Sequence, residues 1–217
     1  MTESFPADWL SLRAPADRDA RNLDLESRFS GWVAARSENG RSPVRLLDLG
    51  SGTGNNRRHL AERLPGPVVW TLTDIDQDHL EHLSLLQATD IDVRPLDLTD
   101  LDAVADAIRK ADAVTCSALL DLVSEDWLDA FCRLIVDAGI PLFAVLTYDG
   151  RIRFHPNRPL DIEIRELVNR HQRSDKGFGP ALGPLAAGRA AAIFQELGYS
   201  ISSAPSDWRL HSAESEL

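Results

Sequence analysis

Long apolar runs, cysteines and clustered histidines are all scarce in this sequence of 217 residues. The longest apolar run, residues 140–146, is far shorter than the roughly 20 residues that a membrane-spanning helix needs. The first residues lack the basic start and apolar stretch of a secretory signal, so we expect a cytoplasmic protein with no membrane partner. Cys116 and Cys132 are too few for a disulfide framework, and the six histidines show no metal-ligand spacing, so no metal is expected.

Acidic residues outnumber basic ones, which gives the chain a net charge of −11. Such a surface repels phosphate backbones, so we expect no nucleic-acid partner. The charge is unevenly distributed, because residues 151–176 hold seven Lys or Arg against four acids, a local +3 that leaves −14 elsewhere. The length and the 43% hydrophobic content suit one globular domain over residues 1–217.

Short apolar runs alternate with segments of helical spacing, which predicts strands that alternate with helices. The predicted strands are residues 44–49, 68–73, 91–95, 112–117 and 141–147, followed at the end by 199–204 and 207–211. The predicted helices are residues 17–36 (after Pro15), 55–64, 77–88, 100–109, 125–138, 160–173 and 184–197. The expected fold is α/β: a Rossmann-like, doubly wound sheet of seven strands, mostly parallel, that ends in a C-terminal antiparallel hairpin. Residues 1–40 are expected to form an N-terminal helical cap.

The first predicted strand runs into a loop with glycine at every second position, residues 50–54. Glycines in such a loop allow a sharp turn and let a ligand approach the backbone. A dinucleotide fingerprint would need glycine at position 55 or 57, where Asn55 and Arg57 stand, and the phosphate-loop pattern is also absent. The loop alone could be a structural turn. An acid two residues before G-x-G-x-G favours a nucleoside ligand without a pyrophosphate.

Acidic residues follow the next two predicted strands as well. Asp74 ends the second strand, where a carboxylate can accept hydrogen bonds from both hydroxyls of a ribose. Asp97 follows the third strand, where it could accept from an adenine amino group. Either acid alone is more often a helix cap or a solvated loop residue. Together with Asp48 before the glycine loop, they favour a nucleoside site.

This combination of motifs resembles the class I S-adenosylmethionine-dependent methyltransferases, over residues 40–148 and 184–211. The resemblance implies a methyltransferase whose cofactor is S-adenosylmethionine. It places the glycine loop at the methionine part of the cofactor, the acid after the second strand at the ribose, and the residues after the third strand at the adenine. Residues after the fourth strand, 117–121, would face the transferred methyl group. The implied cofactor-binding residues are Asp48, Gly50, Ser51, Gly52, Gly54, Asp74, Ile75, Asp97, Leu98 and Ser117, with Asp76 competing for the ribose.

Methyl transfer needs mainly a nucleophile held in line with the methyl group, and it needs a base only where the nucleophile must lose a proton. The candidate catalytic residues are Asp121, Tyr148, His155 and His171. Each also has a plain structural interpretation: a helix cap for Asp121, a turn for the residues around Tyr148, and solvated surface for the histidines. Arg13 could meet the methionine carboxylate of the cofactor, or could equally lie on the surface.

Residues 149–183 are an insertion rich in Gly and Pro near its end, which favours a lid over the substrate. Its basic residues favour a small anionic substrate; alternatively, they pair with Asp161, Glu163 and Glu166 along one helix. We therefore expect a methyltransferase for a small anionic molecule. The alternatives are a regulatory protein that binds S-adenosylmethionine without catalysis and, against the glycine spacing, an NAD-dependent oxidoreductase.

Overall fold

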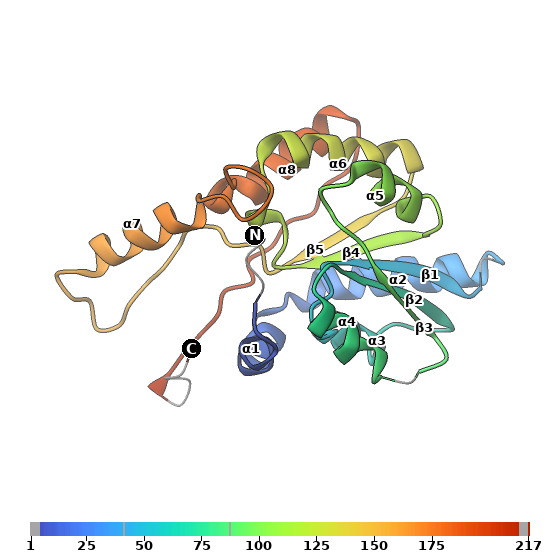
Figure 1. The fold of residues 1–217 in the computed structure, drawn as a ribbon, viewed down its shortest axis with the longest axis horizontal. Helices are drawn as coiled ribbons and strands as arrows, with labels where there is room; N and C mark the ends of the chain where they lie inside the picture. Colours follow the sequence, from blue (N-terminus) through green and yellow to red (C-terminus); the bar gives the residue numbers. More distant parts are fainter. Residues whose placement is uncertain (1–4, 41, 87, 213–216) are drawn as a thin grey trace.

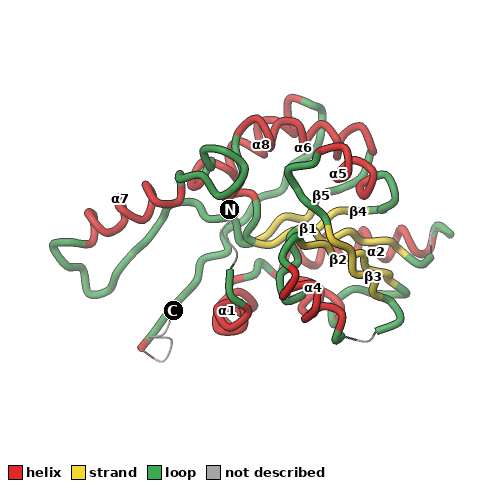
Figure 2. The backbone as a smooth tube through the Cα atoms, viewed as in Figure 1, coloured by secondary structure: helices red, strands yellow, loops and turns green. Residues whose placement is uncertain are grey.

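A computed structural model describes residues 5–40, 42–86, 88–212 and 217. The described residues form a parallel sheet of five strands in the order β3-β2-β1-β4-β5, with helices on both faces (Figures 1 and 2). The strands are β1 (Val44–Leu49), β2 (Val68–Asp74), β3 (Ile91–Pro95), β4 (Ala113–Ser117) and β5 (Leu142–Val145). Each lies close to a predicted strand.

Six helices cover the sheet, three on each face (Figure 1). On one face lie α2 (Leu23–Glu38), α3 (Asn55–Ala61) and α4 (Gln77–Ser84), and on the other lie α5 (Leu101–Ile108), α6 (Glu125–Ala138) and α8 (Ala186–Glu196). Among the described residues, no helix has the length and apolar character that a membrane span requires.

The central strand β1 is apolar because both of its sides are buried. Leu47 and Leu49 contribute to the core beneath α5, α6 and α8, whereas Val44 and Leu46 contribute to the core beneath α2, α3 and α4. All four are at most 1% exposed. A buried side chain of this kind stabilises the fold by roughly 1.5–3 kcal/mol, so β1 ties the two layers of helices together.

Capping residues explain why several predicted helix boundaries agree with the observed ones. The α6 helix begins after Ser124, whose side chain accepts from Trp127 N–H, and ends at Gly139, whose φ of 65° suits glycine. Asp100 caps α5 in the same manner. These local signals are readable in the sequence, and the predicted helix at residues 125–138 is the observed one.

The prediction of one helix over residues 17–36 is wrong. The structure has α1 (Ala7–Ala20), which contains Pro15, and then α2. The chain turns at Arg21, whose backbone is extended, and Asn22 caps α2 by accepting from Leu25 N–H at 3.1 Å. The predicted helix start at residue 17 was based on Pro15, because proline often precedes or begins a helix. Asn22 was the stronger signal, because asparagine is a preferred N-cap residue.

The prediction of seven strands with a C-terminal antiparallel hairpin is also wrong. Residues 200–211 are described and form no strand. Side chains hold this tail instead: Trp208 Nε1 donates to Asp17 Oδ1 at 2.9 Å, and Arg151 pairs with Asp207 at 3.2 Å. A cavity of about 350 Å³ lies between residues 199–203, β5 and α8. The tail therefore does not extend the sheet.

The lid predicted at residues 149–183 is an arm that stands away from the sheet (Figures 1 and 2). Its helix α7 (Asp161–Gln172) has no buried residue among those described. The chain returns through η2 (Gly183–Leu185) to α8. The arm leaves from the carboxyl edge of the sheet, directly after β5.

Gly54→Ala is expected to destabilise the protein by about 1–2 kcal/mol. Gly54 has a φ of +82°, and a Cβ there would lie 3.0 Å from Leu83 Cδ2, inside the core. Gly31 in α2 is the matched control, because a Cβ there meets nothing within 4 Å. Gly31→Ala should stabilise the helix by about 0.5–1 kcal/mol. Urea unfolding of both variants measures the difference, and equal effects would contradict the account.

Candidate functional site

The carboxyl ends of the strands form one edge of the sheet, at the left of Figure 1. The strand order places β2 and β3 on one side of β1 and places β4 and β5 on the other. In open α/β sheets, ligands bind outside the carboxyl ends of the strands where the order reverses in this way. The glycine loop follows β1, and residues 117–121 follow β4, so both predicted segments lie at this point.

The glycines of the loop are required by its backbone. Gly50, Gly52 and Gly54 have φ values of 61°, 52° and 82°, which residues with a Cβ rarely adopt. Ser51 fixes the turn, since its N–H donates to Thr73 O at 2.8 Å and its hydroxyl donates to the main-chain oxygen of residue 48 at 2.9 Å. The loop is thus anchored to both β1 and β2.

The carboxylate at the end of β2 is bonded directly to the glycine loop. Asp74 Oδ2 accepts from Gly52 N–H at 2.8 Å, and Oδ1 accepts from the N–H groups of Ile75 and Asp76 at 2.9 and 3.0 Å. Asp76, the competitor for the ribose, instead caps the first turn of α4 with its side chain. The Asp74 carboxylate thus contacts the loop directly.

Apolar side chains stand beside the loop. A Cβ placed on Gly50 would lie 3.6 Å from Leu119 Cδ1 and 4.0 Å from Leu98 Cδ1. Leu98 is held in place because its carbonyl accepts from Trp127 Nε1 at 2.6 Å. Asp97 lies next to it in an exposed turn, where its Oδ1 accepts from Thr99 N–H and Oγ1 at 2.8 and 2.7 Å. Residues after the first, third and fourth strands therefore meet around Gly50.

The N-terminal helix α1 lies over the glycine loop. Leu10 Cδ1 lies 2.8 Å from the position that a Cβ on Gly52 would take, so a larger residue there would have to displace the Leu10 side chain. Asn55 Nδ2, at the start of α3, donates to Leu10 O at 2.8 Å. Arg13 on the same helix pairs with Asp17 at 2.8 Å, and its guanidinium lies over the ring of Trp208. Arg13 therefore lies near the site, but its guanidinium already pairs with Asp17 and lies over Trp208.

Asp121 is the one candidate catalytic residue that is deeply buried. It lies in η1 (Leu120–Leu122), only 5% exposed, and its Oδ1 has no hydrogen-bond partner among the described residues. Burial raises the pKa of Asp121 from 3.8 to about 6, against the opposing effects of backbone N–H groups, including that of Tyr148, and of Arg13. A carboxylate with this pKa is suited to accept a proton near neutral pH.

The other three candidates lie outward from Asp121. Tyr148 is half-buried, burial raises the pKa of its hydroxyl, and that hydroxyl donates to Asn169 Oδ1 at 2.7 Å, on α7. His155 and His171 are both exposed on the arm. The structure thus brings Asp121 and Tyr148 together and leaves the histidines on the surface of the arm.

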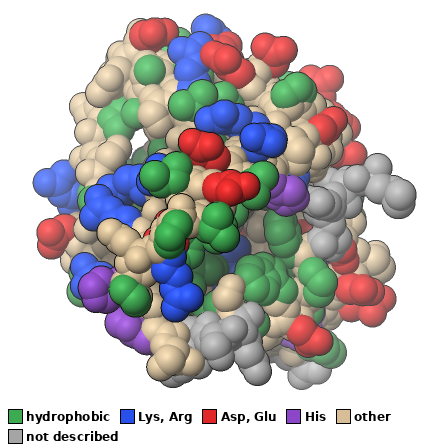
Figure 3. All heavy atoms as spheres, turned by 90° about the vertical axis from the view of Figure 1, so that its left-hand side faces the viewer, with side chains coloured by type: hydrophobic (Ala, Val, Ile, Leu, Met, Phe, Trp, Pro, Cys, Tyr) green, Lys and Arg blue, Asp and Glu red, His purple; other side chains and the backbone are tan. Residues whose placement is uncertain are grey.

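The basic residues of the arm are not paired along α7. Among the described residues, no ion pair involves Arg153, Arg165, Arg170 or Arg173, so the expected alternative of pairing with Asp161, Glu163 and Glu166 is not observed. Figure 3 shows the molecule from the side of the arm, with Lys and Arg side chains around apolar ones. The arm therefore carries unpaired positive charge at the carboxyl edge of the sheet.

Residues 46–138 match the family model of a methyltransferase domain, which covers β1 through α6 and hence the glycine loop, Asp74 and Asp121. This stretch of the chain is consistent with the class I S-adenosylmethionine-dependent methyltransferase family. The resemblance inferred from the sequence motifs is confirmed. No curated protein matches the sequence significantly.

Solved structures with the same fold include human N-acetylserotonin methyltransferase in complex with S-adenosylmethionine, with 14% identity, a TM-score of 0.52, 89% of this chain covered and 49% of that one. A proposed O-methyltransferase from Nostoc punctiforme has 16% identity and a TM-score of 0.52, covering 90% of this chain and 53% of that one. A possible exported protein from Bordetella parapertussis has 15% identity and a TM-score of 0.53, covering 82% and 61%. This chain therefore spans about half to three fifths of their lengths.

Sequence reasoning included Leu10 only as part of the expected N-terminal cap and assigned Asn55 no place in the site. Leu10 and Asn55 join α1 to the loop, although neither belongs to a motif. In the sequence, Asn55 was used only as evidence against a dinucleotide fingerprint, which would need glycine at position 55 or 57. Its position directly after the last loop glycine was a usable signal, because an amide at the start of a helix can bond to a covering segment.

Asp121→Asn is expected to stabilise the protein at pH 8 by about 1–3 kcal/mol, with no gain below pH 4. Because the native pKa of Asp121 is raised to about 6, the folded state binds a proton between pH 4 and 6 that the unfolded state releases. Wild-type stability therefore falls as the pH rises through that range, and the variant lacks this loss. Urea unfolding between pH 4 and 8 measures it. Exposed Asp137→Asn is the control, and parallel pH curves for wild type and Asp121→Asn would contradict the burial effect.

Proposed function

We propose that this chain transfers the methyl group of S-adenosylmethionine to a small anionic molecule. The observation that carries the proposal is the hydrogen bond from Gly52 N–H to the Asp74 carboxylate, which joins the glycine loop to the acid after β2. A nucleoside with an attached amino acid needs both parts at once: backbone for the methionine end and a carboxylate for the ribose. The family match supports the same cofactor.

The residues around the loop fit this cofactor. Gly50 leaves backbone accessible where a side chain would otherwise stand, and Leu98 and Leu119 offer an apolar surface beside it, whereas Leu10 of α1 takes the corresponding place at Gly52. Asp74 would hold the ribose together with Ile75, which is 52% exposed, while Asp97 and Leu98 would flank the adenine. Ser51, Gly54 and Ser117 would shape the methionine end. Bound S-adenosylmethionine supplies a methyl group that its sulfonium already activates for displacement.

The protein's own contribution would be positioning, exclusion of water and, for acceptors that must lose a proton, a base. Asp121 is the favoured base, because its buried carboxylate has a free oxygen at the carboxyl edge of the sheet. Its pKa of about 6 leaves it ionised at neutral pH while it remains a better proton acceptor than an exposed carboxylate. Tyr148 would line the same space, and His155 and His171 would contribute only if the arm folds inward.

The arm supports an anionic acceptor. Its unpaired arginines lie on an arm that leaves from the carboxyl edge of the sheet, in a chain whose remaining residues carry a net negative charge. An anionic molecule is repelled by most of that surface and attracted to the arm, which would guide it to the carboxyl edge of the sheet. Residues 149–183 would then cover the acceptor while α1 covers the cofactor loop.

Asp74→Ala is expected to weaken binding of S-adenosylmethionine at least tenfold in calorimetric titration, because ribose hydroxyls lose a charged acceptor. Asp78→Ala is the matched control, since Asp78 lies exposed in the first turn of the neighbouring helix α4. Circular dichroism should show that both variants are folded. Unchanged affinity in a folded Asp74→Ala variant would remove Asp74 from the ribose site.

The double variant Arg165→Gln and Arg170→Gln is expected to raise KM about fivefold or more for carboxylate acceptors and to leave their methyl esters unaffected. Acceptors found in a screen for methyl transfer would be compared as acid and ester pairs. Arg133→Gln and Arg109→Gln, which lie exposed on α6 and directly after α5, are the matched control. An equal change for acids and esters would contradict recognition of the anion by the arm.

A further inference from the structure

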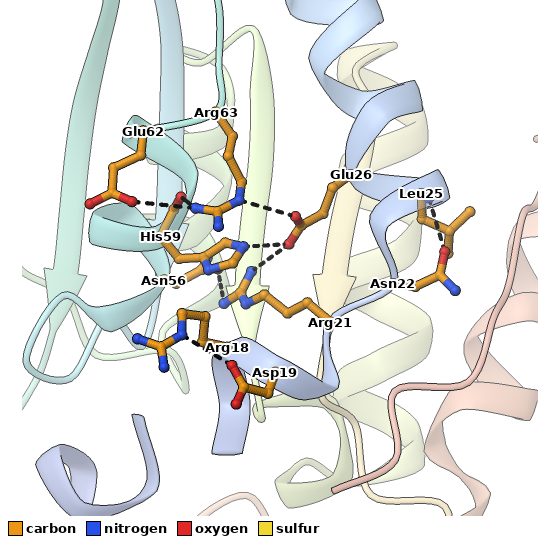
Figure 4. Close-up of polar contacts among 10 residues, drawn as sticks. All are labelled: Arg18, Asp19, Arg21, Asn22, Leu25, Glu26, Asn56, His59, Glu62 and Arg63. Carbon is orange, nitrogen blue, oxygen red and sulfur yellow. Dashed lines mark hydrogen bonds and ion pairs between the residues drawn. The ribbon is translucent and has the colours of Figure 1, made fainter. Parts of the chain in front are cut away.

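Helices α1 and α7 both lie outside the two layers of helices that cover the sheet, and they differ in how they are held. Directly after α1, Arg21 Nη2 donates to Asn56 Oδ1 at 2.8 Å, and Arg21 Nη1 lies 3.7 Å from Glu26 Oε1. His59 Nε2 lies 2.7 Å from the same oxygen, which completes a buried cluster of charged residues from three segments (Figure 4). The end of α1 is thus anchored in the interior, whereas α7, all of whose residues are described, has none of them buried.

Helix α7 is held along one side. The Tyr148 hydroxyl donates to Asn169 Oδ1 at 2.7 Å, and Asn169 Nδ2 donates to Gly150 O at 3.2 Å. Burial raises the pKa of the Tyr148 hydroxyl, and the charge of Arg165, on this same side of α7, lowers it. The half-buried residues of the helix recur at helical spacing on this side: 161, 165, 168, 169 and 172. The opposite side of α7 is therefore turned away from the rest of the chain.

That opposite side carries a row of apolar side chains. Leu160, Ile164 and Leu167 are 60%, 41% and 50% exposed. Their spacing of four and then three residues places them in one line along the helix, and His171 continues it. Single exposed apolar residues are common, but a row at this spacing is typical of a helix that packs against another helix. We call Leu160, Ile164 and Leu167 the α7 stripe.

Charged side chains beside the α7 stripe are unpaired within the chain. Glu163 and Arg170 lie on the same flank of the stripe, seven residues apart. Seven residues extend about 10 Å along a helix, which is too far for the two side chains to pair with each other. Neither has an ion-pair partner among the described residues. One flank of the stripe thus offers one charge of each sign.

These charges complement a second α7 helix that runs in the opposite direction. When Ile164 packs opposite Leu167 of a second copy, Glu163 lies beside Arg170 of that copy, and Arg170 lies beside its Glu163. Two reciprocal ion pairs would then flank the apolar contact. A parallel arrangement would instead place Glu163 beside Val168 and would form no such pair. The charges therefore favour an antiparallel pair of identical helices.

A second copy also suits the position of the stripe. A two-fold axis brings the same surface of two copies together, so each stripe would be covered by the other. The rest of the same chain cannot cover the stripe unless α7 turns over and the bonds of Asn169 to Tyr148 and Gly150 break. Because the 12 residues of α7 extend only about 18 Å, the contact is small and the association is weak.

We propose that the α7 stripe is a docking surface for a second copy of this chain, with the two α7 helices antiparallel and two reciprocal ion pairs between Glu163 and Arg170. The pairing fixes both arms along their outer sides. It leaves Arg165, on the other side of α7, directed toward Tyr148. The inference concerns the arm alone and does not depend on the proposed methyl transfer.

Sedimentation equilibrium of the purified chain between roughly 10 µM and 1 mM tests the docking surface, and a dissociation constant on the order of 0.1 mM is expected. The double variant Ile164→Asp and Leu167→Asp should weaken the dimer at least tenfold, because the contact would bury carboxylates without partners. Leu23→Asp with Leu85→Asp is the matched control, since these leucines are 68% and 73% exposed away from the arm. It should leave the dimer unchanged. A monomeric wild type throughout this range, or an unweakened dimer in the stripe variant, would overturn the proposal.

Charge reversal tests the direction of the two helices. Glu163→Arg alone and Arg170→Glu alone should each weaken the dimer about fivefold, because like charges then face each other twice. The double variant with both reversals restores opposite charges across the contact and should recover the wild-type dissociation constant. Circular dichroism checks that each variant keeps its helices. Single variants that dimerise like wild type, or a double variant that fails to recover, would contradict the antiparallel arrangement.

Discussion

The arrangement of this site depends on two acidic residues that hold the glycine loop, Asp74 through its carboxylate and Asp48 through its main-chain oxygen. Asp74 accepts from the N–H of Gly52 at the outer side of the loop, and Asp48 lies buried beneath it on β1. Parallel strands make this possible, because β1 and β2 run side by side and end at the same edge. The conformation of the loop is consequently fixed by its hydrogen bonds to the sheet, although its glycines alone would leave it flexible.

The two ends of the chain complete the surroundings of this loop. Helix α1 lies over the loop through Leu10 and Asn55, and the C-terminal tail is fastened to α1 by Trp208 and Asp17. The arm after β5 reaches the same edge and contacts the tail through Arg151. Segments distant in sequence thus gather at the carboxyl ends of the strands, where the proposed methyl transfer would require water to be excluded.

Much of the fold could be predicted because its signals are local. The five strands are short apolar runs, and capping residues such as Ser124 and Asp100 mark where helices begin. The glycine loop and Asp74 could be recognised by their spacing. The C-terminal tail could not be predicted, because residues 199–211 have an alternating pattern that suits a strand, whereas side chains of α1, α2 and the arm hold this segment.

The buried cluster of charged residues around Arg21 could not be predicted from the sequence either. Arg21, Glu26 and His59 belong to segments that read as amphipathic helices with charged outer faces, and only tertiary packing turns them inward. The histidines of the arm show the opposite case, since their chemistry suggested catalysis and their exposure leaves them outside the site. Residue type and spacing indicate what chemistry is available, and packing decides which groups share one place.

Calorimetric titration of the unaltered protein with S-adenosylmethionine and, separately, with NAD tests the central claim most directly. The account predicts saturable binding of one S-adenosylmethionine per chain and no binding of NAD, because the loop carries an acid and alternating glycines without the third glycine of a dinucleotide site. Binding of NAD without S-adenosylmethionine would contradict it.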